Sequence, residues 1–165
     1  MVERDAFWDE LGRLERDPAV LRLVEFSQHR GSTTYQHVHN VATCCARLAE
    51  RLGWRGIDGR ALARGAMLHD YYLYDIRDKH MSAWRHGTSH PRRASEQASY
   101  AFDLTQKERD IIESHMWPLT ITKVPRSREA VLVCLADKHV AFCEMVLHRR
   151  VVGARSRRTA DGGAE

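Results

Sequence analysis

The sequence lacks the patterns that mark several classes of protein. It has no apolar run long enough to cross a membrane, and no amino-terminal segment that joins basic residues to an apolar stretch as a secretory signal does. Its four cysteines include no C-x-x-C pair, so we expect reduced thiols that pack inside a cytoplasmic protein, with a zinc–thiolate site as the alternative. Four prolines and no internal repeat among 165 residues predict one domain without a linker.

The positive charge of the chain is concentrated at one end. The formal net charge is +4, and from Arg149 onward five arginines stand against Asp161 and Glu165, which accounts for +3 of it. The rest of the chain, residues 1–148, is therefore close to neutral, and the composition does not favour nucleic acid as a partner. We expect residues 151–165 to form a basic, disordered tail, because they offer few apolar anchors.

Helical periodicity dominates the body of the chain. No segment alternates cleanly enough to predict a strand, and the fold class is therefore all-α, with about six or seven helices. Thr105 and Glu108 form a capping box, and Pro91 suits the first turn of a helix. A long connection is expected over residues 71–89. The predicted helices cover approximately residues 7–14, 20–24, 34–52, 57–69, 91–102, 105–115 and 127–149.

The helix predicted over residues 34–52 carries two histidines on different faces. His37 is in register with Val41, Cys44 and two leucines, so its side chain should point inward. His39 aligns instead with polar residues and should point outward. The register thus separates one candidate ligand from one surface histidine.

Further polar residues occupy predicted inner faces, where apolar residues would be ordinary. His69 continues an apolar stripe and precedes Asp70, His115 follows a pair of isoleucines, and Asp137 lies on the inner stripe of the last helix. Each alone is more often a satisfied core residue or a helix cap. Several unpaired carboxylates and histidines in one small interior are best satisfied by a divalent cation, whose usual ligands they are.

The order of these residues resembles the HD-domain superfamily of metal-dependent phosphohydrolases. The local contexts also agree: H-V-H-N-V-A at His37, A-M-L-H-D at His69 and Asp70, and C-L-A-D-K at Asp137. The resemblance spans about residues 30–145. It implies a single-domain, all-helical bundle over residues 1–150 that holds its metal between helices.

Some branches of that superfamily bind two ions through two further histidines. The resemblance gives these roles to His90, expected at a helix start, and His115, with His86 as the alternative to His90. Asp70 would bridge the ions and direct a hydroxide, because a carboxylate has two oxygens. Ligation rich in histidine favours iron, manganese or zinc over magnesium. The expected ligands are His37, His69, Asp70 and Asp137 for one ion, and Asp70, His90 and His115 for the other.

The substrate is the least determined part. Many HD enzymes carry H-D-x-G-K, whereas Tyr71 and Tyr72 follow the doublet here and the lysine is missing. We expect Lys79, Arg93 and Lys138 to contact phosphate instead, and the tyrosines to pack or to form a wall for an organic group. The resulting hypothesis is hydrolysis of a small-molecule phosphate ester, such as a nucleotide. The alternative is a non-catalytic metal-containing module that senses a nucleotide or binds a partner or RNA.

Overall fold

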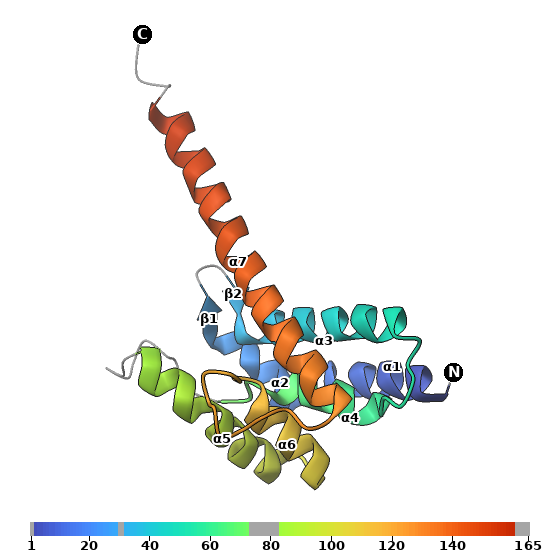
Figure 1. Cartoon of the computed structure of the whole chain (residues 1–165). Helices are drawn as coiled ribbons and strands as arrows, with labels where there is room; N and C mark the ends of the chain where they lie inside the picture. The colour runs from blue at the N-terminus through green and yellow to red at the C-terminus, as the bar shows by residue number, and fades with distance from the viewer. Residues whose placement is uncertain (1, 30–31, 73–82, 161–165) are drawn as a thin grey trace.

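The structure is a computed structural model that describes residues 2–29, 32–72 and 83–160, with residues 2, 29, 83–87 and 147–160 described through their backbone alone (Figure 1). Within these residues, seven α-helices dominate, which confirms the predicted all-α class. The elements in chain order are α1 (Val2–Leu14), α2 (Pro18–Leu21), the 3-10 helix η1 (Arg22–Glu25), β1 (Ser27–His29), β2 (Ser32–Thr33), α3 (Thr34–Arg51), α4 (Gly59–Leu68), α5 (Ala83–Ala101), α6 (Gln106–Ser114) and α7 (Arg128–Ala160).

Helix α4 lies at the centre of the bundle, because α1, α3, α6 and α7 all pack against it. Nearly all of its side chains are buried. Its glycines permit this close approach: a Cβ at Gly59 would lie 1.7 Å from the backbone oxygen of Glu3, and a Cβ at Gly65 would lie 2.4 Å from Cγ2 of Ile111. The carboxyl end of α4 therefore delivers the two residues that follow it into the interior.

The ends of the helices agree with the capping residues in the sequence. The capping box of Thr105 and Glu108 begins α6, as predicted, and a second box formed by Thr33 and Gln36 begins α3. Asp58 caps α4 by accepting a hydrogen bond from the backbone N–H of Ala61. These caps fix where α3, α4 and α6 begin.

Two predictions about local structure are wrong. A short antiparallel pair, β1 and β2, precedes α3, although its strands are too short to show alternation in the sequence. Helix α5 begins at Ala83, so His90 and Pro91 lie inside the helix and not at its start. A proline in that place removes one backbone hydrogen bond of the helix, but the amphipathic face continues through it.

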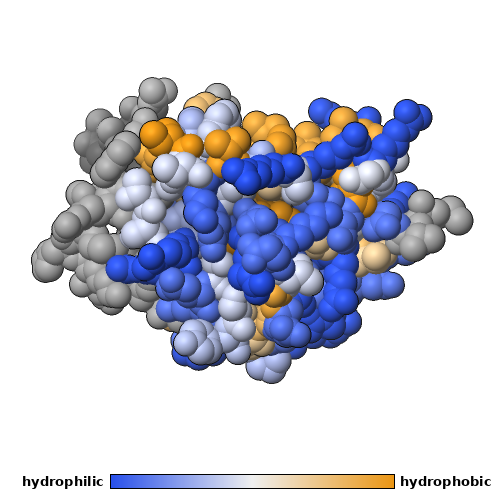
Figure 2. All heavy atoms as spheres, turned by 60° about the horizontal axis from the view of Figure 1, so that its bottom comes forward, coloured by the Kyte–Doolittle hydropathy of each residue, from blue (hydrophilic) through white to orange (hydrophobic). Residues whose placement is uncertain are grey.

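The outer surface is mainly polar on one side and partly apolar along α7. Figure 2 shows a largely hydrophilic face with hydrophobic atoms along its upper edge. Exposed apolar residues recur on α7, and a hollow of about 610 Å³ lies between this helix and the end of α3. Helix α7 projects beyond the other helices in Figure 1 and includes residues 151–160 of the segment for which we predicted disorder. No helix among the described residues is long and apolar enough to span a membrane.

Candidate metal centre

Six polar side chains meet in the interior around the carboxyl end of α4. His69 is the C-cap residue of α4 and Asp70 follows it, while His115 is the C-cap residue of α6. Helices α3, α5 and α7 contribute one residue each. None of the six is more than 8% exposed: His37, His69, Asp70, His90, His115 and Asp137. The structure thus brings together all six ligands expected from the sequence.

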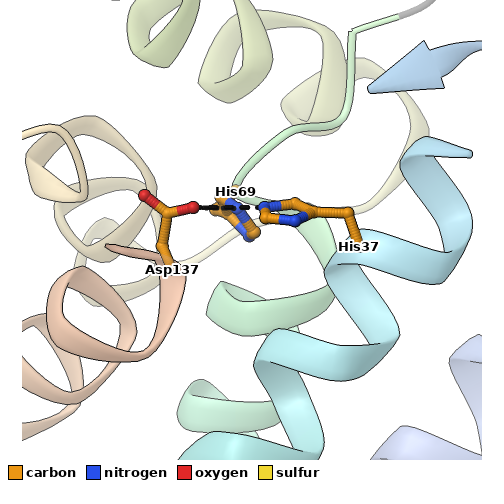
Figure 3. A group of neighbouring side chains, drawn as sticks. All are labelled: His37, His69 and Asp137. Carbon is orange, nitrogen blue, oxygen red and sulfur yellow. Dashed lines mark hydrogen bonds and ion pairs between the residues drawn. The ribbon is translucent and has the colours of Figure 1, made fainter. Parts of the chain in front are cut away.

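The first group joins α3, the end of α4 and α7 (Figure 3). Nε2 of His37 lies 3.1 Å from Oδ1 of Asp137, and Nε2 of His69 lies 3.7 Å from the same oxygen. One atom from each of the three residues falls within 4.8 Å of the others. That spacing suits three ligands of a single ion.

The second group is centred on Asp70. Its Oδ1 lies 3.3 Å from Nε2 of His90 and 3.6 Å from Nε2 of His115, and those two nitrogens are 2.8 Å apart. Its Oδ2 faces the other way, 3.5 Å from Nε2 of His69 and 3.9 Å from Nε2 of His37. The two carboxylate oxygens of Asp70 therefore face different pairs of histidines, Oδ1 toward His90 and His115 and Oδ2 toward His37 and His69.

Backbone contacts select the tautomers of two of the histidines. Nδ1 of His69 lies 2.8 Å from the carbonyl oxygen of Ala66, and Nδ1 of His115 lies 2.7 Å from that of Ile112. A carbonyl only accepts, so Nδ1 carries the proton in both rings. The lone pair of each neutral ring is then on Nε2, the atom that faces the other ligands.

His37 is oriented by a carboxylate. Its Nδ1 lies 3.1 Å from Oε2 of Glu144, which also accepts a hydrogen bond from Asn40 through Oε1 at 3.0 Å. Burial would lower the pKa of His37, but the hydrogen bonds to Asp137 and Glu144 outweigh it and raise that pKa to about 10. The metal-free ring is therefore doubly protonated, and an ion would take the place of its Nε2 proton.

The electrostatics of Asp70, Asp137 and His115 favour the ligand forms, whereas the pKa of His69 is raised. Burial would lower that pKa, but the carboxylates of Asp70 and Asp137 outweigh burial, and an ion would also displace the Nε2 proton of His69. Burial would raise the pKa of Asp70, yet the surrounding histidines, His69 foremost, hold it far below its usual range. Burial would raise the pKa of Asp137 as well, but the hydrogen bond from His37 and the charge of the nearby His69 hold it well below its usual range. Burial, followed by the charge of nearby histidines, lowers the pKa of His115 to about 3. Anionic carboxylates and a neutral imidazole are the species that bind metal.

Two buried atoms of this cluster have no hydrogen-bond partner, namely Nε2 of His69 and Oδ1 of Asp70. Leaving such atoms unsatisfied costs about 1–3 kcal/mol each. Each of these atoms offers a lone pair, which a cation or a proton can satisfy. The residues present therefore fit a divalent ion.

Two contributors to the site were missed in the sequence. Glu144 is seven residues after Asp137 on α7, which places both on the same face of the helix, so its spacing was a usable signal. Gln28, in β1, donates a hydrogen bond from Nε2 to Oδ2 of Asp70 at 2.5 Å. No periodic pattern marks Gln28, because its strand has only three residues.

The three residues expected to contact substrate differ in their structural surroundings. Nζ of Lys138 donates to the carbonyl oxygen of His115 at 2.8 Å and so caps the end of α6. Arg93 is half-buried on α5. Lys79 lies outside the described residues, as does the side chain of His86, the alternative to His90.

The tyrosines after the doublet and the cysteines serve packing. Tyr71 and Tyr72 are buried, and the ring of Tyr71 packs edge-on against Phe102 with centroids 5.3 Å apart. The four cysteines are free, as expected. Two hollows on the surface, of about 570 and 610 Å³, are lined by none of the six ligands.

Comparison with known proteins identifies one family. The model of the HD domain matches residues 34–141, well over half of the chain, and this range contains all six ligands. No curated protein and no solved structure matches the chain.

Proposed function

The chain belongs to the HD domain family, and from that premise we propose that it hydrolyses a phosphate ester of a small molecule, with a nucleotide as the first candidate. The family is one of metal-dependent hydrolases, and the His and Asp groups described above could hold a metal. The observation that carries the proposal is the geometry of Asp70, whose two oxygens face two different sets of histidines. Such a carboxylate can serve two ions at once.

The roles of the residues follow from this arrangement. His37, His69 and Asp137 would hold one ion, His90 and His115 the other, and Asp70 both. Imidazole-rich ligation favours iron, manganese or zinc. Divalent ions held there would neutralise phosphoryl charge and lower the pKa of water from 15.7 to about 7. The anionic carboxylates of Asp70 and Asp137 and the neutral ring of His115 are in the ligand form before any ion arrives, whereas an ion would displace the Nε2 proton of His37.

The substrate contacts are a finer part of the proposal. Lys79, Arg93 and Lys138 are the cations that we propose for phosphate, and Nζ of Lys138 also donates to the end of α6. Lys138 would contribute its charge, and not a direct contact, unless that bond opens. The free cysteines support a cytoplasmic site of action.

A substrate panel tests the proposed reaction. The protein, supplied with excess manganese or iron, is assayed against phosphomonoesters, cyclic nucleotides and dinucleotides. We expect turnover of at least one class and its loss in Asp70→Asn, which keeps the shape of the side chain and removes the bridging charge. The matched control is Asp110→Asn, on the exposed face of α6. Tight nucleotide binding without turnover would favour the alternative, a non-catalytic sensor.

The number of ions needs its own measurement. Elemental analysis of the wild type should give about two ions per chain. The double variant His90→Ala, His115→Ala should retain about one, because the ligands from α3, α4 and α7 remain. A wild-type ratio near one would reject the two-ion part of the proposal and leave a mononuclear site.

A further inference from the structure

Gln28 joins the amino-terminal hairpin to the candidate metal centre. It lies in β1, outside the range 34–141 that the family model matches. Its Nε2 donates to Oδ2 of Asp70 at 2.5 Å. Its Oε1 accepts hydrogen bonds from the hydroxyl of Tyr72 and, at 3.4 Å, from Oγ1 of Thr34. Every polar atom of this side chain is thus engaged.

The chemistry of the neighbours allows only one orientation of this amide. A carboxylate that is to bind a cation offers acceptors alone, so the N–H side of the amide must face Asp70. The opposite orientation would set the carbonyl oxygen of Gln28 against an oxygen of Asp70. The hydroxyl of the buried Tyr72 then has the amide oxygen as its acceptor, which accounts for a tyrosine in a fully enclosed position.

Backbone hydrogen bonds fix the surroundings of Gln28, both in its own hairpin and in the turn that carries Asp70 and Tyr72. The strand of Gln28 pairs with β2, and the backbone N–H of Thr34 donates to the carbonyl of Phe26 at 2.8 Å, which ties the hairpin to the start of α3. In the turn, the backbone N–H of Tyr72 donates to the carbonyl of Asp70 at 2.8 Å. The contacts from Gln28 to Asp70 and from Tyr72 to Gln28 therefore close a ring around one tight turn.

We propose that Gln28 is a positioning residue that fixes the carboxylate of Asp70 in its bridging orientation. With Oδ2 held by the amide on the side of His37 and His69, Oδ1 is left facing His90 and His115. Rotation of the carboxylate would break the hydrogen bond between the buried Asp70 and the partly buried Gln28. The inference rests on the proposed function, because bridging has a purpose only in a two-ion site, but it concerns metal binding and not turnover.

Metal affinity without substrate is the direct test. The manganese dissociation constant of the wild type is compared with that of Gln28→Leu, which keeps the approximate size of the side chain and removes the donor. Outer contacts of this kind change metal affinity by about 10–100-fold, and we expect a weakening in that range. The control is Gln106→Leu, the same substitution at an exposed position on α6, for which we expect a change of less than about twofold.

A spectroscopic readout separates positioning from a loss of fold. The visible absorption of the cobalt-substituted protein reports ligand geometry, and it should change in Gln28→Leu and stay the same in Gln106→Leu. Tyr72→Phe removes one of the hydroxyls that orient the amide, so it should shift both readouts in the same direction by a smaller amount. If Gln28→Leu does not fold, the manganese affinity and cobalt spectrum of Tyr72→Phe test the proposal in its place.

The possible results distinguish this inference from the proposed function. Weakened manganese binding in Gln28→Leu, in a protein that hydrolyses none of the panel, would support positioning and refute the hydrolase. Unchanged affinity and an unchanged cobalt spectrum in a folded Gln28→Leu would overturn positioning, whatever the activity. A wild type that binds neither metal would overturn it as well.

Discussion

The contact between Glu144 and His37 makes a quantitative prediction about metal affinity. Glu144→Gln keeps the size of the side chain and one acceptor oxygen but removes its charge. Oε2 of Glu144 lies 3.1 Å from Nδ1 of His37, and Asn40 donates to Oε1. The substituted amide should stay in place once Asn40 turns its own amide, so that its oxygen accepts from the new N–H group. The ligand His37 would then be supported by a neutral acceptor, and its Nε2 would be a weaker base toward an ion.

The magnitude follows from the kind of bond that is lost. Partners that orient a ligating histidine are worth about 10–100-fold in metal affinity, or about 1.4–2.8 kcal/mol at about 1.4 kcal/mol for each factor of ten. Glu144 is the strong case, because its side chain is only 14% exposed and that of His37 is fully buried. We therefore expect the manganese dissociation constant to rise by at least tenfold, with little change in the helical signal.

The assay is a competition titration with a metal-sensitive dye, run on the wild type, Glu144→Gln and Glu50→Gln. Glu50 is in the last turn of α3 and pairs with Arg4 at the surface, so its substitution controls for a lost carboxylate elsewhere. A dissociation constant of Glu144→Gln within twofold of the wild type would refute the idea that this carboxylate supports His37. Equal weakening in both variants would point to the overall charge of the protein.

The remaining predictions concern register, packing and pH. His37→Ala should lose metal, while His39→Ala should retain it, because His39 is partly exposed; equal metal contents would contradict the assignment. Gly65→Ala should lower the free energy of unfolding by about 1–3 kcal/mol in urea titrations, since its Cβ would lie 2.4 Å from Cγ2 of Ile111; unchanged stability would show that α6 can shift. Burial would raise the pKa of Glu10, but hydrogen bonds from two arginines lower it below 4.5. A lowered pKa stabilises the fold above 4.5 and ceases to do so as pH falls. The stability difference between the wild type and Glu10→Gln should therefore shrink in acid, and a constant difference would argue against this ion pair.

The burial of several proposed ligands could be predicted because they occupy positions that packing reserves for an apolar residue, whereas His90 was assigned from the family resemblance. His37 follows the apolar stripe of α3, and the fold leaves its side chain fully buried, as the register indicates. His69 and His115 each end a helix, where the chain can turn a side chain toward a common point. A polar residue in an apolar stripe is visible in the sequence, because helical periodicity defines what the position should hold.

The start of α5 and the β1–β2 hairpin could not be predicted, because the local sequence indicated a different structure or gave no signal. Pro91 is typical of a first turn, yet α5 continues through it, since tertiary packing offsets the missing hydrogen bond. The hairpin of β1 and β2 has strands of three and two residues, which is too short for alternation to be detected. The boundaries of α3 and α6, by contrast, were within reach of the sequence because their capping residues are local.

The hidden features matter for the proposed chemistry, because they hold the predicted ligands from outside. Ser32 in β2 donates to Glu144 at 3.5 Å, and Gln28 in β1 donates to Asp70. The hairpin thus contacts both Glu144, which is the partner of His37, and the carboxylate of Asp70. These contacts join residues 42 and 112 positions apart in the chain, a distance over which no local pattern operates. A scan for ligands along helical stripes finds the residues proposed to bind the ion, and the spacing on α7 offers Glu144 as well. The contacts of Gln28 and Ser32 become visible only once the hairpin is packed against α3 and α7.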